Sequence, residues 1–242
     1  MPLSAHAVPI LSDNYAWLLR DEATGMTAFV DPADADACIA AIDAAGGRLD
    51  MILLTHHHGD HIAGTDQVRD RYGCPVMGAA ADARRLPRLD RALTEGDTVP
   101  LGDSIFQVID TPGHTVGHIA FFGGDQPVLV CGDTLFSLGC GRLLEGTAAD
   151  MFGSLRKFAA LPPGTLVCCG HEYTQSNAKF AVHADPGNAA LQARAAEVAR
   201  LRAAGQPTIP CRLGDELAEN PFIRAPDVAT LASLRSQKDT FR

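Results

Sequence analysis

Histidines and an aspartate are concentrated in one short segment, residues 55–61, which reads THHHGDH and follows an apolar run. Imidazole and carboxylate groups are the ligands that zinc, iron and manganese accept in proteins. His56 and His58 are two residues apart, so they point to the same side of an extended segment. Asp60 and His61 follow at a turn and can face a second ion. The spacing therefore predicts that one short loop serves two adjacent metal ions.

Three more candidate ligands follow along the chain, each directly after a glycine and at the exit of an apolar, β-rich run. They are His114, Asp133 and His171. A glycine after such a run indicates that a strand ends and a loop begins. Loops positioned by a rigid scaffold carry a large share of catalytic residues. Together with the histidine-rich segment, these residues predict a metal-binding active site at several strand ends.

The order H-x-H-x-D-H, followed by a histidine, an aspartate and a last histidine, resembles the signature of the metallo-β-lactamase superfamily. Further segments resemble one family within it, glyoxalase II or hydroxyacylglutathione hydrolase. The resemblance runs from position 55 to the C-terminus and covers essentially the whole chain, with the N-terminal part less distinctive. The segments that carry it are THHHGDHIAGT, DTPGHTVGHI, CGDTLFSLGCGRLLEGT, GHEYTQSNAKFA and LRSQKDTF.

This resemblance implies a site with two divalent metal ions. We expect zinc, with iron or manganese as alternatives, because histidine and carboxylate suit all three metals. Asp60 and Asp133 are the implied catalytic residues, together with a hydroxide that bridges the ions. Two carboxylates and one hydroxide leave the core positively charged, which favours an anionic transition state. The implied ligands are His56, His58 and His114 for the first ion, Asp60, His61 and His171 for the second, and Asp133 for both.

The activity implied by the resemblance is hydrolysis of an S-(2-hydroxyacyl)glutathione thioester, such as S-D-lactoylglutathione. The products are glutathione and a 2-hydroxy acid such as D-lactate, in the second step of methylglyoxal detoxification. The hydroxide is expected to attack the thioester carbonyl while a metal ion stabilises the oxyanion. The thiolate leaves without strong acid assistance. The chain has no G-x-S-x-G segment, which agrees with a mechanism that forms no acyl-enzyme.

Glutathione carries carboxylates, so its binding site requires local positive charge. The residues that the resemblance implies as glutathione contacts are Arg142, Tyr173, Asn177, Arg235 and Lys238. Arg235 and Lys238 are three residues apart, so they share a face if the segment is helical. Many relatives carry an aromatic residue two positions after Arg142, where this chain has Leu144. This difference leaves the affinity for glutathione and the preferred thiol open.

Three alternatives compete with the thioesterase hypothesis. The first is a mononuclear iron dioxygenase of the same superfamily that acts on glutathione persulfide. The glyoxalase-like C-terminal segment, which ends KDTF, favours hydrolysis over that reaction. The second is a lactone or β-lactam hydrolase, which would not need Arg235 and Lys238 near its site. The third is a non-enzymatic metal-binding protein, but seven candidate ligands exceed what a closed structural zinc site needs.

Composition narrows the class of protein. The 242-residue chain is 46% hydrophobic and 20% charged, values that are typical of a soluble globular protein. Its formal net charge of −9 argues against a nucleic-acid partner. We find no apolar run long enough to cross a membrane and no secretory signal, so we expect a cytoplasmic protein. We also find no obvious assembly segment, so we expect a monomer. Seven cysteines without a C-x-x-C pair predict buried thiols rather than disulfides.

The hydrophobic pattern predicts an α+β fold in two parts. Strands alternate with helices up to His171, and helical patterns alone follow at 189–204 and 226–234. The resemblance implies a four-layer αββα sandwich followed by a small helical domain. We therefore expect a metal-binding catalytic domain at 1–171 and a glutathione-binding domain at 172–242. The other predicted strands are 14–19, 27–31, 51–55, 75–78, 104–110, 119–122, 127–131 and 165–169, and the other predicted helices are 34–45, 65–72 and 148–161.

Two further histidines lie near the candidate ligands. His57 has the wrong parity to join His56 and His58, so we expect it to support the site or to face solvent. His118 is four residues past His114 and either supports a ligand through a hydrogen bond or packs in the core.

Overall fold

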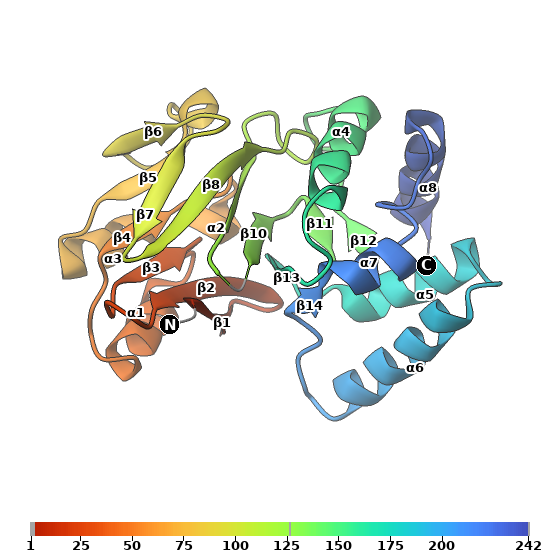
Figure 1. Cartoon of the computed structure of the whole chain (residues 1–242), viewed down its shortest axis with the longest axis horizontal. Helices are drawn as coiled ribbons and strands as arrows, with labels where there is room; N and C mark the ends of the chain where they lie inside the picture. The colour runs from red at the N-terminus through yellow and green to blue at the C-terminus, as the bar shows by residue number, and fades with distance from the viewer. Residues whose placement is uncertain (1–2, 126, 242) are drawn as a thin grey trace.

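The computed structural model describes residues 3–125 and 127–241 and contains two large sheets that pack face to face (Figure 1). The first sheet has six strands. In order across the sheet they are β1 (Leu3–Ile10), β2 (Asn14–Asp21), β3 (Thr27–Val30), β4 (Met51–Leu53), β5 (Val76–Ala79) and β6 (Arg91–Leu93). β1 to β3 are antiparallel, and β3 to β6 run parallel to one another.

The second sheet also has six strands, and only β10 and β13 in it are parallel. In order across the sheet they are β14 (Cys211–Arg212), β13 (Leu166–Cys169), β10 (Val128–Gly132), β9 (Ile119–Gly123), β8 (Ser104–Asp110) and β7 (Thr98–Leu101). A separate antiparallel hairpin follows β10. Its strands are β11 (Leu135–Phe136) and β12 (Gly139–Cys140).

Helices cover the outer faces of both sheets and form the C-terminal part of the chain. The blue and cyan helices α5 to α8 gather at one end of the molecule in Figure 1. The helices are α1 (Ala35–Ala44), α2 (Gly59–Ile62), α3 (Thr65–Tyr72), the 3₁₀ helix η1 (Ala80–Asp82), α4 (Ala148–Ala159), α5 (Thr174–Ala184), α6 (Ala189–Ala203), α7 (Leu213–Glu219) and α8 (Val228–Thr240). This arrangement confirms the predicted α+β sandwich with a helical C-terminal part.

The central strands β3 and β4 of the first sheet are buried on both faces because each face packs against a different layer. In β4, Met51 and Leu53 join the core between the sheets, whereas Ile52 packs toward α1 and α3. In β3, Val30 faces the inner core and Phe29 the outer one. Successive side chains of a strand point to opposite faces, so a fully apolar strand is the pattern of a sheet that is buried on both sides.

Local signals set the limits of several helices. The Asp34 side chain accepts a hydrogen bond from the Ala37 amide at the start of α1. At the start of α4, Thr147 and Asp150 bond to each other's backbone amides in a capping box. Gly73 ends α3 in the left-handed conformation, with φ of 66°. These caps pair backbone groups that a helix end otherwise leaves exposed.

Several elements differ from the sequence prediction. The predicted final helix 226–234 continues to Thr240, and helices α5 and α7 were not predicted. The expectation of helices alone after His171 was wrong in one respect, because β14 returns to the second sheet and pairs with β13. This pairing depends on residues about 45 positions apart (Leu166 with Arg212), which local periodicity does not reveal. Among the described helices, none combines the length and apolarity that crossing a membrane requires.

A buried carboxylate joins the end of β2 in the first sheet to β8 in the second. Asp21 accepts hydrogen bonds from the Ser104 amide at 3.0 Å and the Ser104 hydroxyl at 2.8 Å. It also accepts a bond from the Thr24 amide at 2.9 Å. The bonds from Ser104 and Thr24 lower the pKa of Asp21 from 3.8 to about 2. The ionised form is therefore the one that stabilises the contact between the sheets.

We predict a pH-dependent stability difference between the wild-type protein and the Asp21→Asn variant. Since the pKa of Asp21 is lower in the folded chain, its stabilising effect is present above about pH 4 and disappears as the pH falls toward 2. Urea unfolding midpoints at pH 5, 4, 3 and 2.5 should show a less stable variant at pH 5 and a shrinking difference below pH 4. The exposed Asp103 provides the control variant Asp103→Asn. A difference that stays constant down to pH 2.5 would contradict this role.

Candidate functional site

The predicted ligands all lie in loop segments that follow strands, one of which contains the short helix α2 with Asp60 and His61. The segment 55–61 follows β4, His114 follows β8, Asp133 follows β10 and His171 follows β13. These loops meet at one edge of the sandwich. The backbone packs closely there, since a Cβ added to Gly170 would lie 2.5 Å from Asp133 Oδ1. Glycine at this position is therefore required by space, which explains the glycine that precedes His171.

Three imidazoles converge at the first group of ligands. His58 Nδ1 lies 3.1 Å from His56 Nε2 and 3.0 Å from His114 Nε2. The ligand atoms of these residues are close enough to hold one metal ion. His56 is fully buried, and burial together with the neighbouring histidines lowers its pKa well below the usual value. A neutral imidazole is the form that binds a metal.

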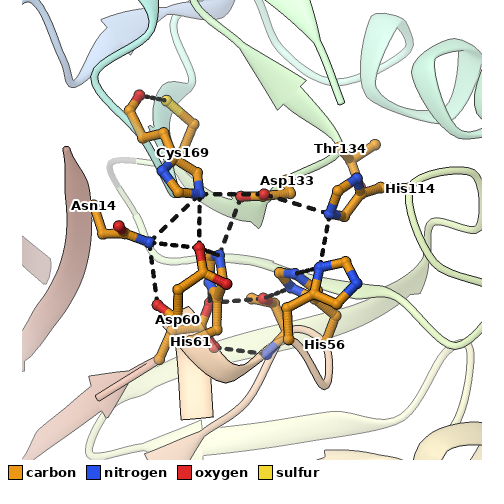
Figure 2. Close-up of polar contacts among 12 residues, drawn as sticks. Asn14, His56, Asp60, His61, His114, Asp133, Thr134 and Cys169 are labelled. Atoms are coloured by element: carbon orange, nitrogen blue, oxygen red, sulfur yellow. Dashed lines mark hydrogen bonds and ion pairs between the residues drawn. The ribbon is translucent and has the colours of Figure 1, made fainter. Parts of the chain in front are cut away.

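The second group consists of Asp60, His61 and His171, and it also satisfies the geometry for one ion. Asp133 lies between the two groups. Its Oδ1 is 3.4 Å from His61 Nε2, while its Oδ2 is 3.3 Å from His171 Nε2 and 3.5 Å from His114 Nε2. Figure 2 shows Asp133 between His114 on one side and Asp60 and His61 on the other. One carboxylate thus reaches both groups.

The residues fit a metal ion because two buried atoms face each other without an ordinary partner. His61 Nε2 and Asp133 Oδ1 form no hydrogen bond within the described part of the chain. Leaving such a pair buried costs about 1–3 kcal/mol per atom, which a coordinated cation would offset. Although burial opposes its charge, His61 and His171 hold the pKa of Asp133 well below its usual value. A buried anion surrounded by imidazoles is the donor set that divalent metals bind.

An outer layer of hydrogen bonds fixes which ring nitrogen faces the site. Asp31 accepts bonds from His61 Nδ1 at 3.0 Å and from the Thr55 hydroxyl at 2.6 Å. Since the hydroxyl donates to Asp31, the Thr55 oxygen accepts from His56 Nδ1 at 3.0 Å. Both imidazoles therefore carry their proton on Nδ1 and leave the Nε2 lone pair for a metal.

The remaining ligands are oriented in the same way. His114 Nδ1 donates to the Arg142 carbonyl at 2.8 Å, and His171 Nδ1 donates to Asp13 at 3.0 Å. Asn14 Nδ2 donates to Asp60 Oδ2 at 3.0 Å. Asp31, Asp13 and Asn14 were not among the predicted site residues. Asp31 is the last residue of the predicted strand 27–31, and an acidic residue at the end of an apolar run is a signal that could have indicated it.

Of the two extra histidines, His118 contacts the backbone of a candidate ligand and His57 does not. His118 is buried, and its Nε2 accepts a hydrogen bond from the Asp133 amide at 3.1 Å. His118 thus helps to hold Asp133, the first of the two roles that we considered. His57 lies against Asp82, with Nδ1 2.9 Å from a carboxylate oxygen, and is outside the ligand groups found among the described residues.

A cavity of about 660 Å³ opens beside the metal-binding groups, and both acidic and basic side chains line it. All five residues that the resemblance implies for glutathione are on its wall, and Leu144 is there with 60% of its surface exposed. The residues that line the cavity are His58, Asp60, His114, Asp133, Phe136, Cys140, Arg142, Leu144, His171, Tyr173, Ser176, Asn177, Lys179, Arg235, Lys238, Asp239 and Phe241.

These five residues do not present their polar groups to the cavity equally. Arg142 is exposed, and Lys238 is half-buried. The Tyr173 ring stacks on His171 at 4.5 Å. Arg235 is 5% exposed, and its guanidinium donates to the Cys140 carbonyl and to Asp239. Asn177 is also buried, and its amide donates to the Ser137 carbonyl.

Comparison with solved structures gives the same fold. Residues of this chain superpose on ETHE1 from Myxococcus xanthus with a TM-score of 0.73 at 23% identity, covering 99% of this chain and 92% of the other. The BLEG-1 B3 metallo-beta-lactamase gives a TM-score of 0.70 at 24% identity, covering 91% and 99%. At these identities the likeness shows the architecture alone. A closer sequence, TTHA1623 in a di-iron-bound form, has 29% identity and a TM-score of 0.56 over 69% of this chain and 91% of the other.

Two family models divide the chain between them, and the curated relatives agree with both. The Metallo-beta-lactamase superfamily matches residues 22–171, and the Hydroxyacylglutathione hydrolase C-terminus matches residues 172–241. A hydroxyacylglutathione hydrolase from Acidiphilium cryptum is 61% identical over 97% of this chain and 95% of its own length. One from Rhodospirillum rubrum is 53% identical over 92% and 87%. With this geometry and these matches, the chain belongs to the hydroxyacylglutathione hydrolase family of the metallo-beta-lactamase superfamily.

Proposed function

We propose that this protein hydrolyses the thioester of S-(2-hydroxyacyl)glutathione, such as S-D-lactoylglutathione, to glutathione and a 2-hydroxy acid. The observation that carries the proposal is that a single cavity is lined by the metal-binding groups and by Arg142, Lys179 and Lys238. Glutathione has carboxylates that these cations attract, and a thioester bound beside them would reach the metal-binding groups. A cavity of about 660 Å³ is of ordinary size for a small-molecule ligand.

The same proposal assigns the ligands and the metals. His56, His58 and His114 would hold one ion, Asp60, His61 and His171 the other, and Asp133 both; the two groups and the reach of Asp133 support this assignment. We propose zinc in both positions of a cytoplasmic monomer. Bound there, two divalent ions would supply a nucleophilic water at neutral pH and polarise the thioester carbonyl. Residues 1–171 would provide this chemistry and 172–242 most of the glutathione contacts.

The side chains of the site act by orientation and by charge. Bonds to Asp31, Thr55, Asp13 and the Arg142 carbonyl hold the imidazole lone pairs in the direction in which a metal ligand must point. Burial and the neighbouring aspartates raise the pKa of Tyr173 to about 12, so its hydroxyl keeps its proton at neutral pH. That hydroxyl is available as a donor to the bound peptide. The glutathione thiolate leaves without a strong acid.

The proposal predicts rapid release of glutathione from S-D-lactoylglutathione by the purified protein. Metal analysis of the same sample should give about two ions per chain, as a two-metal mechanism requires. The Asp133→Ala variant should lose metal and slow hydrolysis by at least about 100-fold, because it removes the carboxylate that reaches both groups. Replacement of the exposed Asp103 by Ala is the matched control.

A fully metal-loaded sample that does not hydrolyse the thioester would reject the proposed function. A sample that holds one iron and consumes oxygen with glutathione persulfide would replace it with the dioxygenase alternative. Full turnover and two ions per chain in Asp133→Ala would reject the role of Asp133.

We predict that Asp31→Ala weakens metal binding by about 10–100-fold, because the variant frees His61 and Thr55 from their common acceptor. Chelator competition would measure the metal affinity, and thermal unfolding of the metal-free protein would measure stability. Asp34→Ala is the control, since it removes the cap of α1 at a cost of about 1 kcal/mol and leaves the site intact. Equal metal affinity in the two variants would show that Asp31 acts on stability alone.

The charge of Lys238 is expected to make the affinity for the thioester depend on pH. Burial, with Arg235 and Arg142 nearby, lowers the pKa of Lys238 from 10.5 to about 8. The positive charge is therefore present below about pH 8 and is lost as the pH rises above it. We predict that KM for the thioester rises between pH 7 and 9.5, and that Lys238→Met raises KM about 3–10-fold at pH 7 and flattens this rise.

Lys179 lies on the wall of the same cavity, and the variant Lys179→Met serves as the control. It should keep the rise of KM with pH. If Lys238→Met showed the same rise as the wild-type protein, the titrating group would lie elsewhere.

A further inference from the structure

The β11–β12 hairpin directly connects the metal site to the substrate cavity. It begins two residues after Asp133 and ends two residues before Arg142. Its turn contains Leu138, which is fully buried and has φ of 57°. A leucine disfavours this left-handed conformation, so contacts from outside the hairpin must hold the turn.

Those contacts come from a glutamate in α7 that the proposed chemistry does not use. Glu216 is 0% exposed. Its Oε2 accepts a hydrogen bond from the Leu138 amide at 2.7 Å, and its Oε1 accepts one from the Ser137 hydroxyl at 3.2 Å. Asn220 also donates to Oε2, at 2.9 Å. A single carboxylate therefore binds both residues of the turn, from a helix about 80 positions further along the chain.

Two other side chains of the C-terminal helices complete this contact. Arg194 of α6 donates to the Ser137 hydroxyl at 3.0 Å, and its guanidinium lies 3.5 Å from Glu216 Oε1. Asn220 donates to the carbonyls of Phe136 and Gly139 at 3.2 and 3.0 Å. Polar groups of both hairpin strands and of the turn are thus bonded to the C-terminal helices. A buried network of hydrogen bonds of this kind favours a single conformation.

The hairpin in turn positions groups that face the cavity. A Cβ on Gly141 would lie 2.0 Å from the Asp133 carbonyl oxygen, so the chain after the hairpin packs directly on the metal-site backbone. The next residue, Arg142, extends its side chain from this segment and accepts the His114 Nδ1 bond on its carbonyl. Phe136 and Cys140 of the hairpin also line the cavity. A shift of the turn would therefore move the cavity wall.

We propose that Glu216 is a positioning residue for substrate binding, which fixes the hairpin turn and thereby places Arg142 and the cavity wall beside the metal site. This inference rests on the proposed function for its substrate and on the contacts of Glu216 for its mechanism. Glu216 touches no substrate. It acts through the Leu138 amide and the Ser137 hydroxyl, and its effect should appear in the binding of the thioester rather than in the chemical step.

The test compares two isosteric variants of α7 in the metal-loaded protein. Glu216→Gln keeps the side-chain volume but replaces one acceptor oxygen with a donor. Glu219→Gln is the matched control, because Glu219 lies on the same helix and pairs with the same Arg194 but faces no hairpin residue. We expect Glu216→Gln to raise KM for S-D-lactoylglutathione about tenfold, with kcat within about twofold and metal content unchanged.

Hydrogen exchange provides a readout that does not depend on turnover. The amides of residues 135–142 should exchange at least about tenfold faster in Glu216→Gln than in the wild-type protein, and at the wild-type rate in Glu219→Gln. If Glu216→Gln does not fold, Ser137→Ala removes one of the two turn contacts and should raise KM about threefold with faster exchange in the same segment.

Faster exchange with an unchanged KM would overturn the positioning role, and so would an unchanged exchange rate. A fall in kcat without a change in KM would also overturn it. If the wild-type protein binds metal but does not hydrolyse the thioester, the proposed function fails, and the exchange rates still decide whether Glu216 fixes the turn.

Discussion

The structure depends on one buried carboxylate. Asp133 is 6% exposed and lies among the imidazoles of His61, His114 and His171. An anion at this depth is costly unless cations surround it, and imidazoles that point at one another are equally unfavourable unless something binds between them. Divalent cations bound among the carboxylate and the imidazoles would solve both problems. The ligands therefore need two kinds of support: strands that deliver them to one place, and hydrogen bonds that keep their lone pairs directed inward.

The sandwich provides the first kind of support. Strands β4, β8, β10 and β13 come from both sheets, and each ends at the same edge of the molecule. The hydrogen bonds of Asp31, Asp13 and Asn14 provide the second kind. These residues lie in the turn after β1, at the start of β2 and directly after β3, in an N-terminal segment that contains none of the candidate ligands. This division explains why the chain builds so large a scaffold around its candidate ligands: apart from Thr55, which directs the adjacent His56, the directing groups lie on different elements from the groups that they direct.

The candidate metal site was the part whose residues the sequence indicated most fully. Its ligands lie in short local patterns, H-x-H-x-D-H and glycine followed by histidine or aspartate, and each pattern lies at the end of an apolar run. Groups that act across the fold left no such pattern. Asp31 and Glu216 each bond to a partner at least 24 positions away, and β14 joins a strand about 45 positions before it. Arg235 shows the same limit. The family motif predicted its place on the cavity wall, but nothing in the sequence indicated its hydrogen bonds to the Cys140 carbonyl and to Asp239.

The C-terminal helices have a structural task in addition to their contribution to the cavity wall. The protein carries a net charge of −9, yet its ligand cavity collects arginine and lysine side chains from the loop after β12 and from α5 and α8. Like charges at close range repel, and the lowered pKa of Lys238 reflects both burial and this repulsion. Flexible loops would let these cations move apart. Here the β11–β12 hairpin that directly precedes Arg142 is bonded to the helices through Arg235, Asn177 and the Glu216 network, so the repulsion is opposed by buried hydrogen bonds that have no alternative partner in water. A cluster of cations held in this way attracts an anionic ligand strongly, because binding requires little further ordering of the protein.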